Sequence, residues 1–184
     1  MSRLPEFRNH IFRNTNSFTR MAEILDLKPY LSHRDWCILL GECWTVCDTI
    51  RQSRFKLRKA LGTVGPVREL MTTEENAQYN NLPEVVTCYR GSDRSVLVGA
   101  SWTLDQNVAK RFPITNRYKV PSPVVVTATV RKDNILAVKL DRGETEIITF
   151  SARRQSTDVV DGSSTDPHTV QTTSTQHQPK GIAA

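Results

Sequence analysis

The run from Val124 to Val130 constrains the fold most strongly, because its side chains favour an extended backbone. It reads Val-Val-Val-Thr-Ala-Thr-Val and is introduced by Pro121 and Pro123. Val and Thr lose rotamer freedom in a helix and pack well on the pleated surface of a sheet. We therefore predict that this run is the strongest strand of the protein.

Further strands are predicted on both sides of this run, all after Glu84. They cover residues 85–89, 95–103, 135–140 and 146–150. Turns are expected at Asp133-Asn134 and at Asp141-Arg142-Gly143, and one or two helical turns at residues 105–112. Consecutive strands joined by short turns favour a mostly antiparallel sheet.

The chain before Glu84 has a helical pattern. Ser32-x-x-Asp35 is typical of a helix start, and apolar residues follow it at helical spacing as far as Ile50. We expect this helix to continue to about Leu61. Shorter helices are predicted around residues 18–27, after Pro66 and after Thr72-x-x-Glu75. Helices followed by strands predict an α+β fold.

The composition sets the expected domain boundaries. The chain has 184 residues, of which 38% are hydrophobic, enough for one domain with an appendage. We expect a domain over residues 1–152, with a helical part at 1–83 and a β-core at 84–152. Polar residues dominate 153–184 and cannot bury enough surface to offset the entropy of ordering, so a disordered tail is predicted there.

The positive charge is concentrated in one segment. The net charge is +6, and five cations lie between Arg51 and Lys59 with no acid between Asp48 and Glu69. Cations at the end of a helix match the helix dipole, which gives the cluster a structural explanation. The alternative is contact with an acidic partner or with nucleic acid.

The cysteines and the apolar runs bear on compartment and metal binding. The four cysteines include no Cys-x-x-Cys pair, which favours buried free thiols over a metal site. Free thiols fit a cytoplasmic protein. No apolar run approaches the length that crosses a membrane, and residues 1–6 lack the apolar segment of a signal peptide.

Two carboxylates, Glu144 and Glu146, lie two residues apart where a strand follows Gly143. Side chains at i and i+2 of a strand point to the same face, so both could share one ligand. Like charges at this distance cost free energy unless a cation or hydroxyl groups lie between them. A solvated strand start is the alternative explanation of this pair alone.

Three motifs occur in a particular order: Tyr89-Arg90-Gly91 at the end of a strand, then Ser101-Trp102-Thr103, then Glu144-Thr145-Glu146. In order, spacing and strand context they resemble the Arg–Ser–Glu branch of the ADP-ribosyltransferase superfamily, whose bacteriophage members are similar in size. The resemblance covers residues 84–150. The middle motif departs from the commoner Ser-Thr-Ser, and the turn before Glu144 is short for recognition of a protein substrate.

The resemblance implies a mono-ADP-ribosyltransferase that consumes NAD and modifies a protein acceptor of the host at arginine. It assigns charge stabilisation at the ribose to Glu146, and Glu144 would orient the acceptor. Arg90 would bind the NAD phosphates, and Gly91 would let backbone approach the ligand. Ser101 would hydrogen-bond the ribose or Glu146. Tyr89 or Trp102 would provide an aromatic wall, and Thr103 would also lie at the cofactor.

Two other functions fit the same residues. A non-enzymatic protein could bind nucleic acid or an acidic partner through the Arg51–Lys59 cluster, with Arg90 in a structural ion pair. An enzyme that uses nucleic acid as the acceptor would combine both features. Binding through the cluster predicts a steep fall in affinity with added salt, whereas the enzyme requires Glu146 and NAD.

Overall fold

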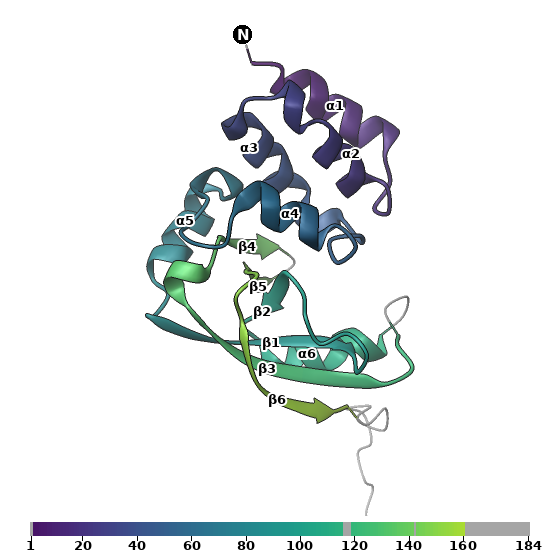
Figure 1. The fold of residues 1–184 in the computed structure, drawn as a ribbon, viewed down its shortest axis with the longest axis vertical. Helices are drawn as coiled ribbons and strands as arrows, with labels where there is room; N and C mark the ends of the chain where they lie inside the picture. Colours follow the sequence, from purple (N-terminus) through teal and green to yellow (C-terminus); the bar gives the residue numbers. More distant parts are fainter. Residues whose placement is uncertain (1, 116–118, 142, 161–184) are drawn as a thin grey trace, which may run out of the picture.

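The computed structural model describes residues 2–115, 119–141 and 143–160 (Figure 1). Helices come first and a sheet follows, which confirms the predicted α+β class. The α-helices are α1 (Leu4–Asn14), α2 (Arg20–Asp26), α3 (His33–Cys43), α4 (Arg54–Leu61), α5 (Thr73–Asn80) and α6 (Gln106–Arg111). The 3-10 turns are η1 (Lys28–Tyr30), η2 (Trp44–Val46), η3 (Arg68–Leu70), η4 (Phe112–Ile114) and η6 (Lys132–Asn134). None of the helices in the described ranges is long and apolar enough to span a membrane.

Side-chain caps begin the two helices at the predicted positions. The backbone N–H of Asp35 donates to Oγ of Ser32 at 3.1 Å at the start of α3. Thr72 and Glu75 form a full capping box at the start of α5, each side chain accepting from the backbone of the other. Each cap satisfies donors that the first helical turn leaves without partners.

The long helix predicted from Ser32 to about Leu61 is wrong. The chain leaves α3 at Cys43, passes through η2 and becomes extended at Cys47 before α4 begins. A tertiary contact favours this break, because the backbone N–H of Asp48 donates to the carbonyl of Ser17 at 2.8 Å. Several β-branched residues in this stretch also weaken helix propensity. Residues 1–31 likewise hold more helix than expected, since α1 spans Leu4–Asn14.

Within the described residues, the sheet has six strands in the order β4-β5-β2-β1-β3-β6, and every neighbouring pair is antiparallel. The strands are β1 (Val85–Asp93), β2 (Ser101–Thr103), β3 (Pro123–Arg131), β4 (Ala137–Asp141), β5 (Glu144–Ile148) and β6 (Arg153–Val159). The predicted central run forms β3 and pairs with β1 along nine residues. Residues 95–100 of the predicted second strand do not belong to a strand, so β2 is only three residues long.

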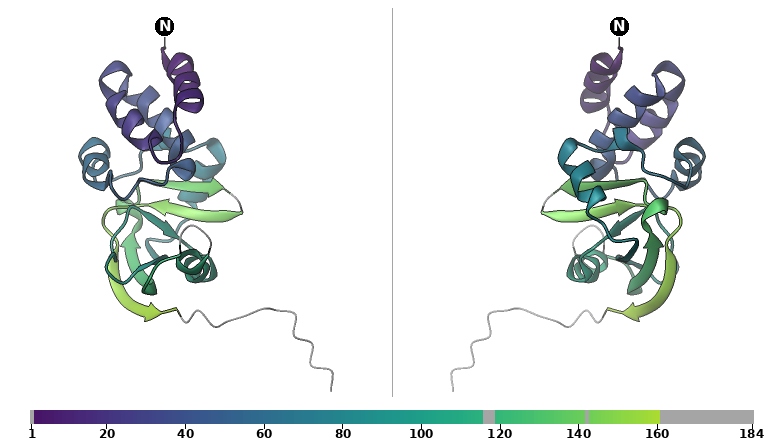
Figure 2. Two further views of the ribbon diagram at one scale, coloured as in Figure 1. Left: turned by 90° about the vertical axis from the view of Figure 1, so that its right-hand side faces the viewer. Right: turned by 90° about the vertical axis from the view of Figure 1, so that its left-hand side faces the viewer.

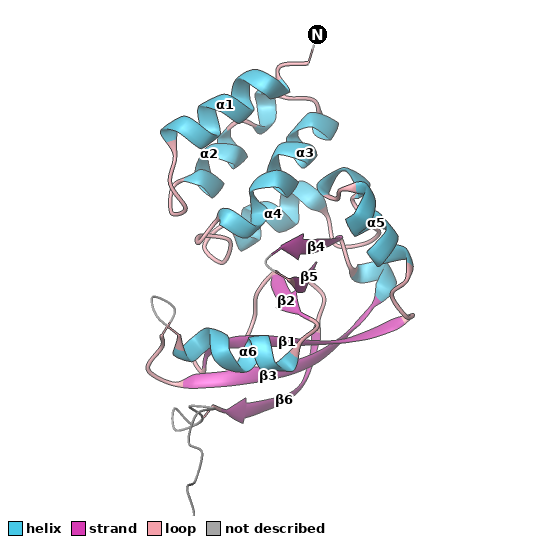
Figure 3. Cartoon of the chain, turned by 180° about the vertical axis from the view of Figure 1, so that it is seen from behind, coloured by secondary structure: helices cyan, strands magenta, loops and turns pink. Residues whose placement is uncertain are grey.

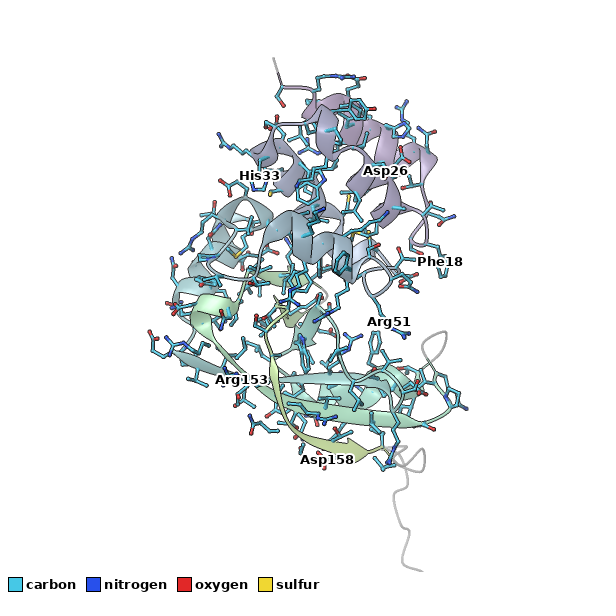
Figure 4. All side chains as sticks on the ribbon, viewed as in Figure 1. Phe18, Asp26, His33, Arg51, Arg153 and Asp158 are labelled. Carbon is cyan, nitrogen blue, oxygen red and sulfur yellow. The ribbon has the colours of Figure 1, made fainter. Side chains whose placement is uncertain are left out.

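The expected boundary at residue 152 is wrong, because β6 lies beyond it. This strand pairs with β3 through the backbone from Val124↔Val159 to Thr129↔Arg153. Its side chains are mostly exposed, and Arg153 and Asp158 mark it at the outer edge of the sheet (Figure 4). The rest of the predicted tail, residues 161–184, lies outside the described residues.

The helical part of the chain lies against the β4–β5 end of the sheet (Figures 1 and 2). Helix α6 covers one face of β1 and β3, which is turned toward the viewer in Figure 3. Large buried side chains from both the helical part and the sheet belong to one core cluster, among them Trp36, Trp44, Leu57, Leu136 and Ile147. The two layers share one hydrophobic core, and the candidate site lies where they meet.

A buried ion pair joins α5 to β4 within this core. Nζ of Lys139 lies 2.8 Å from Oε2 of Glu75 and also donates to the carbonyl of Leu70 at 3.1 Å. The other oxygen of Glu75 accepts from the backbone N–H of Leu140 at 3.0 Å. Only 7% of the Lys139 side chain and 6% of the Glu75 side chain are exposed. A buried charge is tolerated when its hydrogen bonds are satisfied, and these are.

We predict that Glu75→Gln destabilises the fold strongly, because it leaves the charge of Lys139 buried without a counter-ion. Breaking such a pair from one side costs about 3–5 kcal/mol in free energy of unfolding. Glu74→Gln removes an exposed carboxylate from the same helical turn and is the matched control. Urea unfolding of both variants gives the comparison, and equal stabilities would contradict this role for the pair.

Candidate active site

A cavity of about 790 Å³ opens where the helical part meets the sheet, within the range of small-molecule sites. Its lining comes from the η2–α4 segment, from β1 and β2 with their connection, from α6 and η4, and from β4 and β5. The charged residues in the lining are Asp48, Arg51, Arg90, Arg111, Lys139, Asp141, Glu144 and Glu146. Both the helical part and the sheet therefore contribute residues to one site.

Glu146 is held in this cavity by two hydrogen bonds to the same oxygen. Oγ of Ser101 on β2 donates to Oε1 of Glu146, and Nε1 of Trp44 donates to that oxygen at 2.6 Å. The sheet register explains the first contact, since Thr103 pairs with Glu146 and Ser101, two residues before Thr103, lies on the same face of β2. No hydrogen bond from the described residues reaches Oε2 of Glu146, so this oxygen is available to a ligand.

The environment of Glu146 disfavours its charge. Burial raises the pKa of Glu146 above its ordinary value, and the hydrogen bonds from Ser101 and Trp44 and the charges of Arg90 and Lys139 oppose this shift only in part. The residue is nevertheless partly exposed, because it faces the cavity. A carboxylate with a perturbed pKa in a cleft is a candidate for a functional role.

Arg90 on β1 presents a buried guanidinium to the same cavity. Its Nη1 donates to the carbonyl of Ser101 at 2.8 Å, and its buried Nε has no hydrogen-bond partner among the described residues. Gly99 lies directly over this guanidinium, since a Cβ there would collide with Cζ, Nη1 and Nε of Arg90. Burial and the neighbouring charges of Arg51 and Arg54 lower the pKa of Arg90, and Glu146 opposes them.

Most of the charges lining the cavity are divided by sign across the sheet. The carboxylates Asp141, Glu144 and Glu146 lie on β4 and β5, and Asp141 and Glu144 are direct cross-strand neighbours. Arg90 on β1 and Arg111 on α6 lie beyond β2. The cavity therefore has one acidic and one basic side, with Ser101 between them.

The structure brings together four of the predicted site residues, Arg90, Ser101, Glu144 and Glu146, which all line the cavity. Glu144 is exposed, as expected for a group that would meet an acceptor. The hairpin before it is short, as predicted, with Gly143 at φ 74° and Arg142 outside the described residues. The other four predicted residues, Tyr89, Gly91, Trp102 and Thr103, do not line the cavity.

Each of these four has a structural role instead. Gly91 allows helix α6 to pack on β1, because a Cβ there would collide with the carbonyl of Ala109 and the ring of Pro113. Trp102 is a core residue whose Nε1 donates to the carbonyl of Gly99 at 3.3 Å. Oγ1 of Thr103 accepts from the backbone N–H of Asp105 at 3.1 Å, and Tyr89 pairs with Thr103 across the sheet.

The basic cluster from Arg51 to Lys59 does not act as one surface. Arg51 lines the cavity, and it lies between the helical part and the end of the sheet that carries α6 (Figure 4). Arg54 turns inward, with its Nη2 3.4 Å from the carbonyl of Phe150 and its guanidinium over the Phe150 ring. The remaining three cations, Lys56, Arg58 and Lys59, are exposed on α4. Of the five cations, one therefore lines the candidate site, one packs on Phe150 and three are exposed on α4.

The sequence did not indicate several residues of the site. Trp44 and Phe112 provide its aromatic lining, and Arg111 and Lys139 provide further charge. Trp44 lies next to the apolar stripe of α3 and is indistinguishable from a core residue by spacing. Lys139 alternates with apolar residues in β4 and pairs with Glu146 on β5. A Lys opposite a Glu of the next strand could have indicated that Lys139 lies near the site.

The cysteines do not supply an alternative nucleophile. All four thiols are free and buried. Burial raises the pKa of Cys47, which lines the cavity, to about 12. A thiol with this pKa is protonated near neutral pH and is a poor nucleophile. Within the described residues, no group of three or more His, Cys, Asp and Glu side chains is arranged to hold a metal ion.

Comparison of the chain with protein-family models, with curated proteins and with solved structures gives no match. The functional interpretation therefore rests on the residues and geometry of the cavity.

We predict that Glu146→Gln stabilises the folded protein at neutral pH. A carboxyl group whose pKa is raised by folding contributes stability below its unfolded pKa and loses it as the pH rises through the folded value. Glutamine removes the buried charge, and its Oε1 can still accept from Ser101 and Trp44. The gain should be present at pH 7.5 and should shrink as the pH approaches the unfolded value of 4.5.

Urea unfolding at several pH values measures this gain. Glu144→Gln is the control, because Glu144 is exposed on the same strand, and it should change stability little at any pH. A Glu146→Gln variant less stable than the unaltered protein at pH 7.5 would show that the carboxylate is favourable in the fold.

Proposed function

We propose that this protein is an NAD-dependent mono-ADP-ribosyltransferase that modifies a protein acceptor at arginine. The observation that carries the proposal is the set formed by Glu146, Ser101 and Arg90. These residues come from three strands of the predicted motifs and line one cavity, with the hydroxyl of Ser101 donating to Glu146. The order of motifs along the chain alone does not require such proximity.

The cavity fits NAD through its division of charge. A dinucleotide carries a pyrophosphate, for which a planar guanidinium is a suitable partner. Arg90 offers one that lines the cavity and whose Nε has no partner in the described residues, and Gly99 lets the backbone pack closely against it. Arg51 and Arg111 line the same cavity and add positive charge. These three residues would bind the pyrophosphate.

Glu146 would act at the ribose that carries the nicotinamide. Breaking the bond from C1′ of that ribose to the nicotinamide nitrogen develops positive charge at the sugar, as glycoside hydrolysis does. A carboxylate fixed beforehand stabilises this charge without reorganising during the reaction. The hydrogen bonds from Ser101 and Trp44 fix Oε1, so Oε2 is the oxygen that would face the sugar.

Glu144 would orient the acceptor. It is exposed, lines the cavity and lies on the same strand face as Glu146. A guanidinium between Glu144 and Glu146 would reduce the repulsion between these two carboxylates. In the transfer, a guanidinium nitrogen bonds to C1′, the electron pair of the broken bond leaves with neutral nicotinamide, and Glu144 accepts the proton of the attacking nitrogen.

The rival function is binding of nucleic acid or an acidic protein by the cations of α4. Three of those cations are exposed and accessible to such a partner. A protein that only binds would release no nicotinamide from NAD, and substitution of Glu146 would leave its binding unchanged. Nicotinamide release therefore separates the two functions.

We predict that the two carboxylates affect the two half-reactions differently. Glu146→Gln should lower both nicotinamide release and protein labelling by roughly a hundredfold to a thousandfold, the effect of one preorganised electrostatic group. Glu144→Ala should retain slow NAD hydrolysis, because bond cleavage needs only charge stabilisation at the sugar. Labelling should fall much further, since it needs an oriented acceptor.

The experiment measures nicotinamide release and label incorporation side by side, with labelled NAD and host lysate. Asp158→Ala on β6 removes a carboxylate that does not line the cavity and should leave both activities unchanged. A Glu146→Gln variant that keeps half its activity would refute the assignment of Glu146. Equal loss of both activities in Glu144→Ala would mean that the carboxylates act as one unit, and arginine would lose its support as acceptor.

A further inference from the structure

The helical part of the chain contributes a donor to the carboxylate at the centre of the site. Trp44 has no exposed surface, and its Nε1 donates to Oε1 of Glu146 at 2.6 Å across 102 residues of sequence. A hydrogen bond to a charged group is about twice as strong as one between neutral groups. This contact therefore stabilises the Glu146 carboxylate in addition to packing the indole in the core.

The break after α3 places this indole. Helix α3 ends at Cys43 and the chain tightens into the 3-10 turn η2, which begins with Trp44. The residues around Trp44 line the cavity as well, including Thr45 and Cys47. The apolar stripe of α3 predicts that the helix continues. A continuous helix would direct these side chains differently, so the break helps to form the lining of the cavity.

We propose that Trp44 is a positioning residue that holds Glu146 in the orientation and charge state in which it acts. The role of Glu146 in NAD cleavage rests on the proposed function, whereas the hydrogen bond from Trp44 to the carboxylate does not. Because Ser101 and Trp44 approach Oε1 from the sheet and from the helical part, respectively, the carboxylate is fixed from two sides. With only one of these donors, the carboxylate could rotate about the single remaining hydrogen bond.

The remaining charged groups around Glu146 do not replace this contact. Arg90 on β1 and Lys139 on β4 act on Glu146 through their charges, but neither hydrogen-bonds to it. Lys139 is already engaged by Glu75 and Leu70. Glu144 on the same strand and Arg51 before α4 line the cavity without a hydrogen bond to Glu146 in the described part of the chain. Trp44 and Ser101 are thus the two donors.

The test compares Trp44→Phe with Trp36→Phe. Trp36 is equally buried and donates its indole N–H to the carbonyl of Ile24 at 2.8 Å, so the substitution removes a similar hydrogen bond between residues that do not line the cavity. Both variants keep an aromatic ring in the core. Nicotinamide release from NAD is measured against pH, and Glu146 is titrated by NMR in carbon-labelled protein, with Glu146→Gln identifying its signal.

Trp44→Phe should move the titration midpoint of Glu146 upward, because it removes a hydrogen bond that favours the charged form. The acid limb of the activity profile should move upward with it, and kcat at neutral pH should fall at least about tenfold with KM for NAD nearly unchanged. Trp36→Phe should change neither the midpoint nor the pH profile. Equal behaviour of the two variants, or an unchanged midpoint in Trp44→Phe, overturns the proposal.

A second measurement needs no Trp44 variant and covers the case in which Trp44→Phe does not fold. In nitrogen-labelled, otherwise unaltered protein, the indole N–H signal of Trp44 should shift with pH at the midpoint of Glu146, and that of Trp36 should not. A Trp44 indole signal whose chemical shift does not change as Glu146 titrates refutes the contact. Protein that releases no nicotinamide refutes the proposed function instead, while both NMR titrations still decide the role of Trp44.

Discussion

Two hydrogen bonds to one oxygen of Glu146 hold the candidate site together. Burial disfavours the charge of this carboxylate, and the donors Ser101 and Trp44 offset part of that cost while they fix its orientation. One donor comes from the sheet and the other from the helical part, so the site exists only when both layers are packed. The fold therefore accepts a destabilising group at the point where, in the proposed function, it would supply a fixed charge to a ligand.

The second constraint is the distribution of charge around this carboxylate. Acids on β4 and β5 form one side of the cavity, and Arg90 and Arg111 lie on the other side of β2. A ligand with a diphosphate at one end and a cationic reacting centre at the other complements this arrangement. Lys139 is the exception on the acidic side, and its pairing with Glu75 directs its charge into the core. The same pair fixes β4 against α5 and so supports the strand opposite Glu146.

Local rules predicted the elements that local chemistry determines. The caps at Ser32 and Thr72 and the run that forms β3 could be read from neighbouring residues. The three motifs indicated Arg90, Ser101 and Glu146 as site candidates, and these residues line one cavity. The break at Trp44 could not be read, because it depends on contacts with Ser17 and with a carboxylate 102 residues away. Strand β6 was missed because an exposed edge strand pairs through its backbone and needs few apolar side chains. Trp102 and Gly91 were assigned to the ligand from motif proximity, although adjacent residues of a strand face opposite sides.

The most direct test of the account is a crystal structure of the protein with a non-hydrolysable NAD analogue. The account predicts that the analogue occupies the cavity, with its pyrophosphate at the guanidinium of Arg90 and the ribose of its nicotinamide half at Oε2 of Glu146. Oε1 should keep its contacts with Ser101 and Trp44 in that complex. An analogue bound elsewhere, or an empty cavity at millimolar analogue, would contradict the assignment of this cavity as an NAD site.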